Sequence, residues 1–222
     1  ALNLPANPPL SVGGYSNRSG SNGLEFTGPL SEMIFFGTAL PDVERILVDN
    51  YLSARYGVAM TANDRYDGDT FANGEFDLGV AGIGRTGGVS HTQAHSDGMI
   101  VVNRTFLQSD GDWLLFGHNV ATSENTQDDI PAGWDKLTHN PQRWLRSFYI
   151  DVTDDSTVSG GSVDIIFDLS EASMGAPLPA GPLSNYRLLK RSGATGEFTD
   201  ITAASGASVV IIGDQIQFLG VD

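Results

Sequence analysis

The pattern that decides the fold begins at residue 78 and reads LGVAGIGRTGGVSHTQAHSDGMIVVNRTFLQSDGDWLLFGHN, ending at residue 119. Short runs that are apolar or alternate between apolar and polar residues follow one another along this stretch. Gly-Gly and Asp-Gly pairs separate them, and both pairs are typical of tight turns. Runs of this length, with turn signals between them, indicate β-strands that return on themselves.

The same pattern continues to the end of the chain. Further strands are predicted within residues 143–152, 161–170, 185–193, 198–202, 207–214 and 215–222, whereas residues 120–141 have the composition of a loop. About nine short strands at close spacing favour two packed antiparallel sheets. The sequence therefore predicts a mainly all-β fold, an antiparallel β-sandwich over residues 59–222.

One helix, over residues 41–56, interrupts the β pattern near the start of the chain. Pro41 suits a first helical turn, Asp42 and Glu44 complement the helix dipole, and Gly57 is a typical C-terminal stop. One face is apolar and consists of Leu40, Val43, Leu47, Tyr51 and Ala54. Before the helix, strands are predicted near residues 10–12, 24–27 and 33–36.

Composition excludes several classes of function. The formal net charge is −15, and only 12 residues are Lys or Arg, which argues against nucleic acid as a partner. This acidity is compatible with calcium as a bound cation. Cysteine is absent, which excludes disulfides and thiolate metal sites. The chain contains no apolar run of the roughly 20 residues that a membrane helix needs, so no membrane insertion is expected.

The segment GPLSEMIFFGTALPDVERILVDNYLSARYGV, residues 28–58, resembles the end of a concanavalin-like, laminin-G-type domain of bacterial surface proteins. The matching positions are Ser31, Glu32, Leu40, Asp42, Glu44, Arg45, Tyr51, Leu52, Tyr56 and Gly57. Pro41 departs from the usual Ser or Thr of that family, which weakens the helix cap.

The remainder is similar to the β-sandwich domain that commonly follows that helix. The motifs that carry this resemblance are VAGIGR (80–85), QAHS (93–96), WLLFGHN (113–119), RWLRSFYIDV (143–152) and QIQFLG (215–220). The resemblance implies a division into residues 1–58, the terminal strands and helix of a laminin-G-like unit, and residues 59–222. It also implies an extracellular or bacterial cell-surface location, and it assigns no chemistry.

Asp64, Asp67 and Asp69 form the candidate metal site. They lie in the turn-rich segment NDRYDGDT (63–70), and calcium binds clustered carboxylate oxygens. Asp-Gly is equally common in ordinary turns. His91 and His95 are expected on one strand, where residues four apart lie about 13 Å from each other, too far to share a metal ion.

Trp134, in the polar loop PAGWDK (131–136), is the candidate ligand contact, whereas Trp113 and Trp144 occupy strand motifs and are expected in the core. No catalytic residue is assigned. Asp164 and Asp168 would suit a glycosidase pair, but their alternation with Ile166 more simply indicates the solvated side of a strand.

Two functions follow from these observations. The first is a non-catalytic extracellular structural or adhesive module that assembles with copies of itself through unpaired edge strands. The alternative is a carbohydrate-binding module, calcium-assisted, whose ligand is a surface polysaccharide. A hydrolase is the third and weakest reading, because the chain carries no G-x-S-x-G, P-loop or H-E-x-x-H motif.

Overall fold

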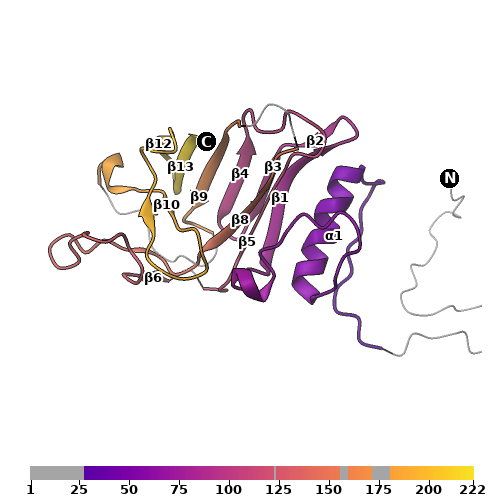
Figure 1. Ribbon diagram of the computed structural model, residues 1–222, viewed down its shortest axis with the longest axis horizontal. Coiled ribbons are helices and arrows are strands. Elements are labelled where there is room, and N and C mark those ends of the chain that lie inside the picture. The colour runs from indigo at the N-terminus through magenta and orange to yellow at the C-terminus, as the bar shows by residue number, and fades with distance from the viewer. Residues whose placement is uncertain (1–27, 123, 156–159, 172–180) are drawn as a thin grey trace, which may run out of the picture. The chain divides into compact units, whose positions relative to one another are not determined.

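The computed structural model describes residues 28–122, 124–155, 160–171 and 181–222 (Figure 1). It is mostly β, with 33% of residues in strands and 12% in helices, which confirms the predicted all-β class. The chain divides into two compact units, Ala1–Ala39 and Leu40–Asp222. None of the described helices is long and apolar enough to cross a membrane.

Two antiparallel sheets form the second unit. The smaller has four strands in the order β2 (Val89–His91), β1 (Leu78–Thr86), β5 (Trp113–His118), β8 (Phe148–Thr153). The larger has five, in the order β12 (Ser208–Ile212), β13 (Gln215–Val221), β9 (Val163–Asp168), β4 (Met99–Asn103), β3 (Gln93–Ser96). Every predicted strand after residue 59 is present.

Short elements complete the unit. Two ribbons of two-residue strands pair β6 (Asn125–Thr126) with β7 (Arg143–Trp144) and β10 (Leu189–Lys190) with β11 (Thr199–Asp200). Two 3₁₀ turns are η1 (Phe71–Asn73) and η2 (Leu183–Asn185). The β3–β4 hairpin turns at Asp97 and Gly98, both with positive φ, as a two-residue Asp-Gly turn requires.

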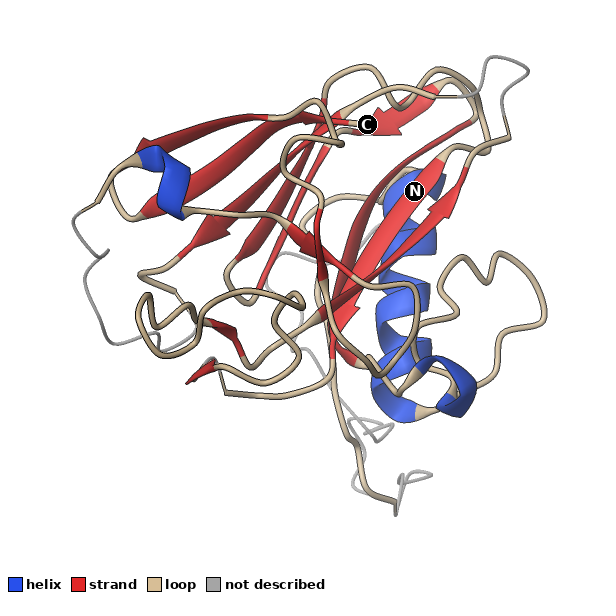
Figure 2. Ribbon diagram, turned by 60° about the vertical axis from the view of Figure 1, so that its left-hand side comes forward, coloured by secondary structure: helices blue, strands red, loops and turns tan. Residues whose placement is uncertain are grey.

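The main core lies between the two sheets, which form separate layers in Figure 2. β1 contacts β3 and β4 across this interface. The core side chains alternate along each strand with residues that face the other way; they include Ile83, Val101, Leu114, Phe116 and Ile165. Packing of this kind defines a β-sandwich.

The outer face of the four-stranded sheet is covered by α1 (Asp42–Tyr56), so that β5 is buried along its whole length. Leu114 and Phe116 face the inter-sheet core, whereas Trp113 and Leu115 face the helix, as the pleat of a strand dictates. Val43 and Ile46 of the helix are buried in this layer, at 1% and 5% exposure. Burying each contributes about 1.5–3 kcal/mol.

The helix α1 begins after Pro41 and ends before Gly57, as the sequence predicts. Pro41 precedes the first turn and forms no side-chain cap, and Gly57 ends the helix in the left-handed conformation at φ 61°. Asn50, 1% exposed, fixes the helix to the following segment. Its amide nitrogen donates to the carbonyls of Ile46 and Asn63, and its amide oxygen accepts a hydrogen bond from the Arg65 N–H at 2.7 Å.

Of the strands predicted before the helix, the described residues include only the one over residues 33–36. The strand predicted over residues 33–36 is wrong, since this segment has no regular secondary structure. A strand needs a neighbour to pair its backbone groups, and residues 28–39 have no sheet partner among the described residues. The strands predicted near residues 10–12 and 24–27 lie outside the described residues.

The structural division at residue 39 differs from the sequence-based division at residue 58, because α1 packs on β1.

Replacing Asn50 with Ala tests the helix anchor. Loss of three hydrogen bonds leaves buried backbone groups unpaired, and we expect the free energy of unfolding to fall by about 2–3 kcal/mol. Asp49→Ala, which removes only an exposed ion pair with Arg45, serves as the control and should cost less than about 1 kcal/mol. Equal losses in urea denaturation of the two variants would contradict the anchoring role of Asn50.

Candidate functional site

A pocket of about 410 Å³ lies between β8 and the inner face of β9 and β13. Residues from two loop regions, 125–147 and 185–198, form the rest of its wall. These regions meet through a backbone hydrogen bond from the Phe198 N–H to the Asp129 carbonyl at 2.7 Å. Ligand sites in proteins commonly have volumes of 300–1,000 Å³, so the pocket has room for a small molecule or a sugar ring.

Aromatic rings make up much of the wall. Phe167 of β9 lies at the centre, edge-on to Trp144 with a centroid distance of 5.3 Å and close to Phe148 and Phe218 at 6.3 and 6.1 Å. Trp134, half-buried, contributes from the loop between β6 and β7. The sequence-based candidate Trp134 is therefore part of a pocket, together with aromatic side chains from four strands.

Trp144 departs from its prediction. It was expected in the core with Trp113, yet it is half-buried and lines the pocket, because β7 belongs to a small ribbon rather than to either large sheet. Trp113 is 1% exposed and packs beneath α1, as predicted for a core residue.

Arginine supplies the charge of the pocket wall. Arg143, Arg146 and Arg187 line it, and the described residues of the wall include no Asp or Glu. Arg143 and Arg191 both pack against the ring of Phe198, with guanidinium carbons 4.8 and 4.5 Å from its centroid. Asp129 forms ion pairs with both, at 3.6 and 3.3 Å. This group carries one net positive charge beside the pocket.

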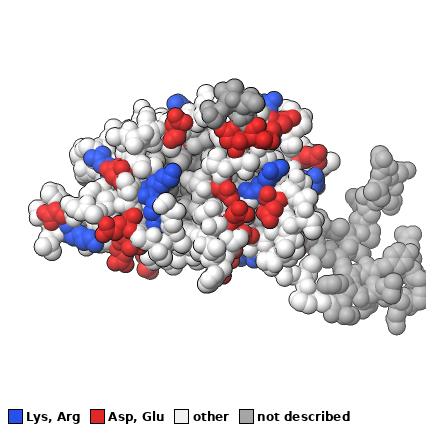
Figure 3. Space-filling view, in the orientation of Figure 1, with Lys and Arg blue, Asp and Glu red and all other residues white. Residues whose placement is uncertain are grey.

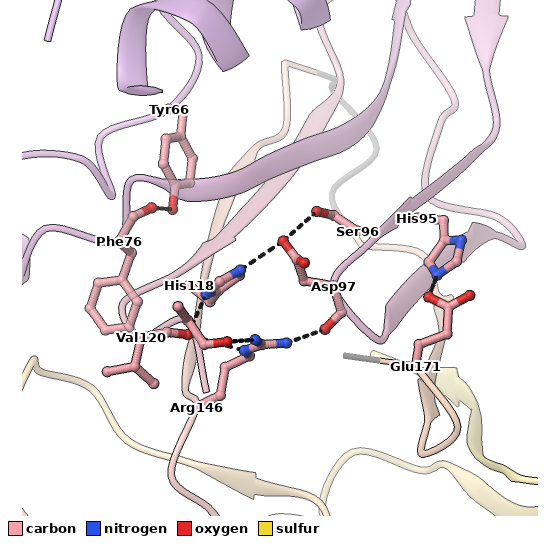
Figure 4. A network of polar contacts seen from close by, with 10 residues as sticks. Tyr66, Phe76, His95, Ser96, Asp97, His118, Val120, Arg146 and Glu171 are labelled. Atoms are coloured by element: carbon pink, nitrogen blue, oxygen red, sulfur yellow. Dashed lines mark hydrogen bonds and ion pairs between the residues drawn. The ribbon is translucent and has the colours of Figure 1, made fainter. Parts of the chain in front are cut away.

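Arg146 holds the loops that meet at the pocket. It is 4% exposed, and its guanidinium donates to the carbonyls of Asp97, Val120 and Ala121 at 2.6, 3.1 and 2.6 Å (Figure 4). These carbonyls belong to the β3–β4 turn and to the segment after β5. A buried guanidinium needs such partners, because an unpaired one would lose several kcal/mol of solvation.

His118, at the end of β5, extends this network. Its Nδ1 lies 2.8 Å from the Val120 carbonyl, which only accepts hydrogen bonds, and its Nε2 lies 2.8 Å from the carboxylate of Asp97 (Figure 4). The two ring nitrogens thus each have an oxygen partner, one on the segment after β5 and one on the β3–β4 turn. Burial alone favours the neutral carboxyl, but the hydrogen bond and charge of His118 outweigh it and lower the pKa of Asp97.

The three residues of the candidate calcium site are close in sequence, but the described residues contain no group of three or more His, Asp or Glu side chains that could hold a metal ion. The Asp67 N–H donates instead to the carboxylate of Asp151 at 2.7 Å. Burial, and then the charges of Asp64 and Asp67, raise the pKa of Asp69. Like charges thus oppose one another here, and calcium binding stays a prediction.

The two histidines lie on separate strands, since Thr92 separates β2 from β3. His91 is 3.6 Å from a carboxylate oxygen of Glu44, and His95 contacts Glu171 at 2.5 Å (Figure 4 shows the latter pair). Each imidazole therefore has its own carboxylate partner. The expectation of a single strand carrying both is therefore wrong.

Sequence reasoning missed most of the pocket. Arg187, Tyr186 and Phe198 come from a region assigned to ordinary strands, and nothing in their spacing connects them to Trp134. The one available signal was that residues 120–141 read as a long loop, and such loops in compact domains often carry binding sites.

No family model, curated protein or solved structure that was compared with the chain matches it. The laminin-G-type resemblance and the surface location that it implies therefore stay predictions.

Replacing Asp69 with Asn tests the charge repulsion among the clustered carboxylates. A raised carboxyl pKa means that the folded state binds the proton more tightly, so the ionised group destabilises the fold at neutral pH. We expect Asp69→Asn to raise the melting temperature at pH 7 in a chelator, and the gain to vanish below about pH 3.8, where the carboxyl is protonated in both states.

Glu197→Gln makes the same charge change at an exposed position and is the control, with little change in melting temperature expected. A lower melting temperature of Asp69→Asn in chelator would contradict the repulsion. A gain in chelator that reverses on adding calcium would support the calcium site.

Proposed function

We propose that this chain is a non-catalytic β-sandwich module that binds a carbohydrate ring in the pocket beside Trp134. The observation that carries the proposal is the pocket itself, in which indole and phenyl faces lie next to side chains with amide groups. Aromatic faces pack on the apolar faces of sugar rings, and amides such as those of Asn125, Gln142 and Asn185 suit their hydroxyls. An extracellular setting, implied by the laminin-G-type resemblance, belongs to the same proposal.

The positions of the Asp and Glu side chains support binding of a sugar rather than its hydrolysis. Glycosidases of the common mechanisms need two carboxyl groups beside the sugar, one with a raised pKa, and the described pocket wall has neither Asp nor Glu. Asp164 instead pairs with Arg104 at 2.9 Å and accepts the Gly220 N–H. The hydrogen bond from the Ser170 side chain lowers the pKa of Asp168, which is the opposite of what a general acid requires.

Self-association is a second candidate function, and a different observation favours it. Within residues 28–39, the side chains with large exposed apolar surfaces are Leu30, Met33, Ile34, Phe35 and Phe36, at 39–63% exposure. An apolar segment of this length, with one charged residue, suits strand addition to the edge of a second copy. In the described residues β12 pairs with β13 alone and β8 with β5 alone, so both sheets present such edges.

Trp134→Ala tests carbohydrate binding. Loss of a stacked ring should weaken the affinity for a bound oligosaccharide at least about tenfold, measured by isothermal titration calorimetry against a panel of oligosaccharides. Leu137→Ala, in the same loop and 97% exposed, is the control and should leave the affinity unchanged. Absence of binding by the native protein across the panel, or equal affinities of the two variants, would overturn the proposal.

A double substitution, Ile34→Ser with Phe35→Ser, tests self-association. We expect the native chain to sediment with a concentration-dependent mass and the double variant to sediment as a monomer, because the exposed apolar segment has lost its two central side chains. Leu183→Ser, at a 46% exposed position in the second unit, should associate like the native chain. A native chain that sediments as a monomer at all concentrations would contradict self-association.

A further inference from the structure

The charge of the pocket wall is opposite to that of the chain. The chain has 27 acidic residues against 12 Lys and Arg, yet three arginines and no acidic residue line the pocket in the described structure. Figure 3 shows one face of the molecule, where red and blue side chains are interspersed. The concentration of arginine at the pocket is therefore local and does not reflect a generally basic surface.

Because salt screens distant charges, the charges close to the pocket have the largest effect on a bound ligand. At physiological ionic strength, charges more than about 8 Å apart on a protein surface interact weakly. Asp129 and Asp200 lie within that distance of the wall, but each is already paired with arginine, Asp129 with Arg143 and Arg191, and Asp200 with Arg187. The guanidinium groups of the wall are in reach of the ligand, so they determine which ligand charge the pocket favours.

The three arginines differ in how far they are already engaged. Arg146 is held by three carbonyls, and Arg143 donates to the carbonyls of Asp128, Trp144 and Leu145 and is 11% exposed. Arg187 has a 39% exposed side chain, and its Nε lies 3.2 Å from Asp200. A guanidinium has five donors in a fixed fork, more than the Nε contact with Asp200 uses, and the fork matches a carboxylate. Arg187 is thus the residue best placed to contact an anion in the pocket.

From this arrangement we infer that the pocket takes an acidic saccharide, a ring that bears a carboxylate, with Arg187 as the contact for that carboxylate and Trp134 as the stacking face. The inference rests on the proposed carbohydrate-binding function and specifies its ligand class. The aromatic wall accounts for the ring, the amide side chains for its hydroxyls, and the arginines for its charge. The donors of Arg143 and Arg146 are already engaged by carbonyls, and Asp129 pairs with Arg143, so the preference for the acid depends on Arg187.

The test uses uronate oligosaccharides of several ring configurations, each paired with its methyl ester, which keeps the ring and removes the charge. For the native chain, calorimetry should show at least about fivefold tighter binding of the acid than of its ester, a preference that decreases as salt is raised. Arg187→Gln should lose this preference, so that the acid and the ester of a pair bind with equal affinity.

Two variants complete the test. Lys190→Gln makes the same charge change three residues away, on β10 and outside the pocket wall, and should keep the preference for the acid. Trp134→Ala should weaken binding of acid and ester alike, because stacking does not depend on the carboxylate. Circular dichroism melting of each variant shows whether it is folded.

The outcomes separate the inference from the function on which it rests. Equal affinity of the native chain for acid and ester would overturn the acidic-ligand inference and leave carbohydrate binding intact. A preference that survives in Arg187→Gln would overturn the assignment to Arg187. Failure of the native chain to bind any acid, ester or neutral oligosaccharide would overturn the proposed function and the inference together.

Discussion

The two sheets are of unequal width, and this constraint determines the layout of the second unit. β1 contacts β3 and β4, and β8 ends the four-stranded sheet, whereas β13 and β12 lie beyond β9 in the five-stranded sheet. The apolar side chains of Ile216 and Phe218 on β13 must be covered, because exposed apolar area of this size is unfavourable. Residues 186–201 cover them through Leu188, Tyr186 and Ile201. The pocket lies between this covering segment and the strands, and residues of both line it.

A buried polar network stabilises the loops at this junction. Arg146 connects the β3–β4 turn to the segment after β5, and the His118–Asp97 pair joins the same two places. Gly79 lies so close to Asp97, Ser96 and His118 that a Cβ atom would collide with their side chains. Charged groups buried this deeply stabilise a fold only when every donor has a partner. Each nitrogen of the Arg146 guanidinium and of the His118 ring has an oxygen partner, and Arg146 is thereby fixed in the wall of the pocket.

The sequence was informative about elements and much less so about the site. Periodicity and turn residues identify the helix and the strands after residue 59, because their patterns reflect local burial. The strand predicted over residues 33–36 fails because MIFF has strand-like composition but no neighbour to pair with. Trp134 was recognisable as an aromatic residue in a polar loop. Its pocket was not, since Arg187 and Phe198 reach it through contacts between residues more than 50 positions apart.

Amide hydrogen exchange with and without a saturating uronate oligosaccharide measures most directly whether the loop-covered junction of the sheets is the binding site. The account predicts slower exchange in residues 141–148 and 185–189 on adding the oligosaccharide, with unchanged exchange in α1 and β2. Slower exchange confined to α1, β2 or the segment 63–70, with none at the pocket, would contradict it.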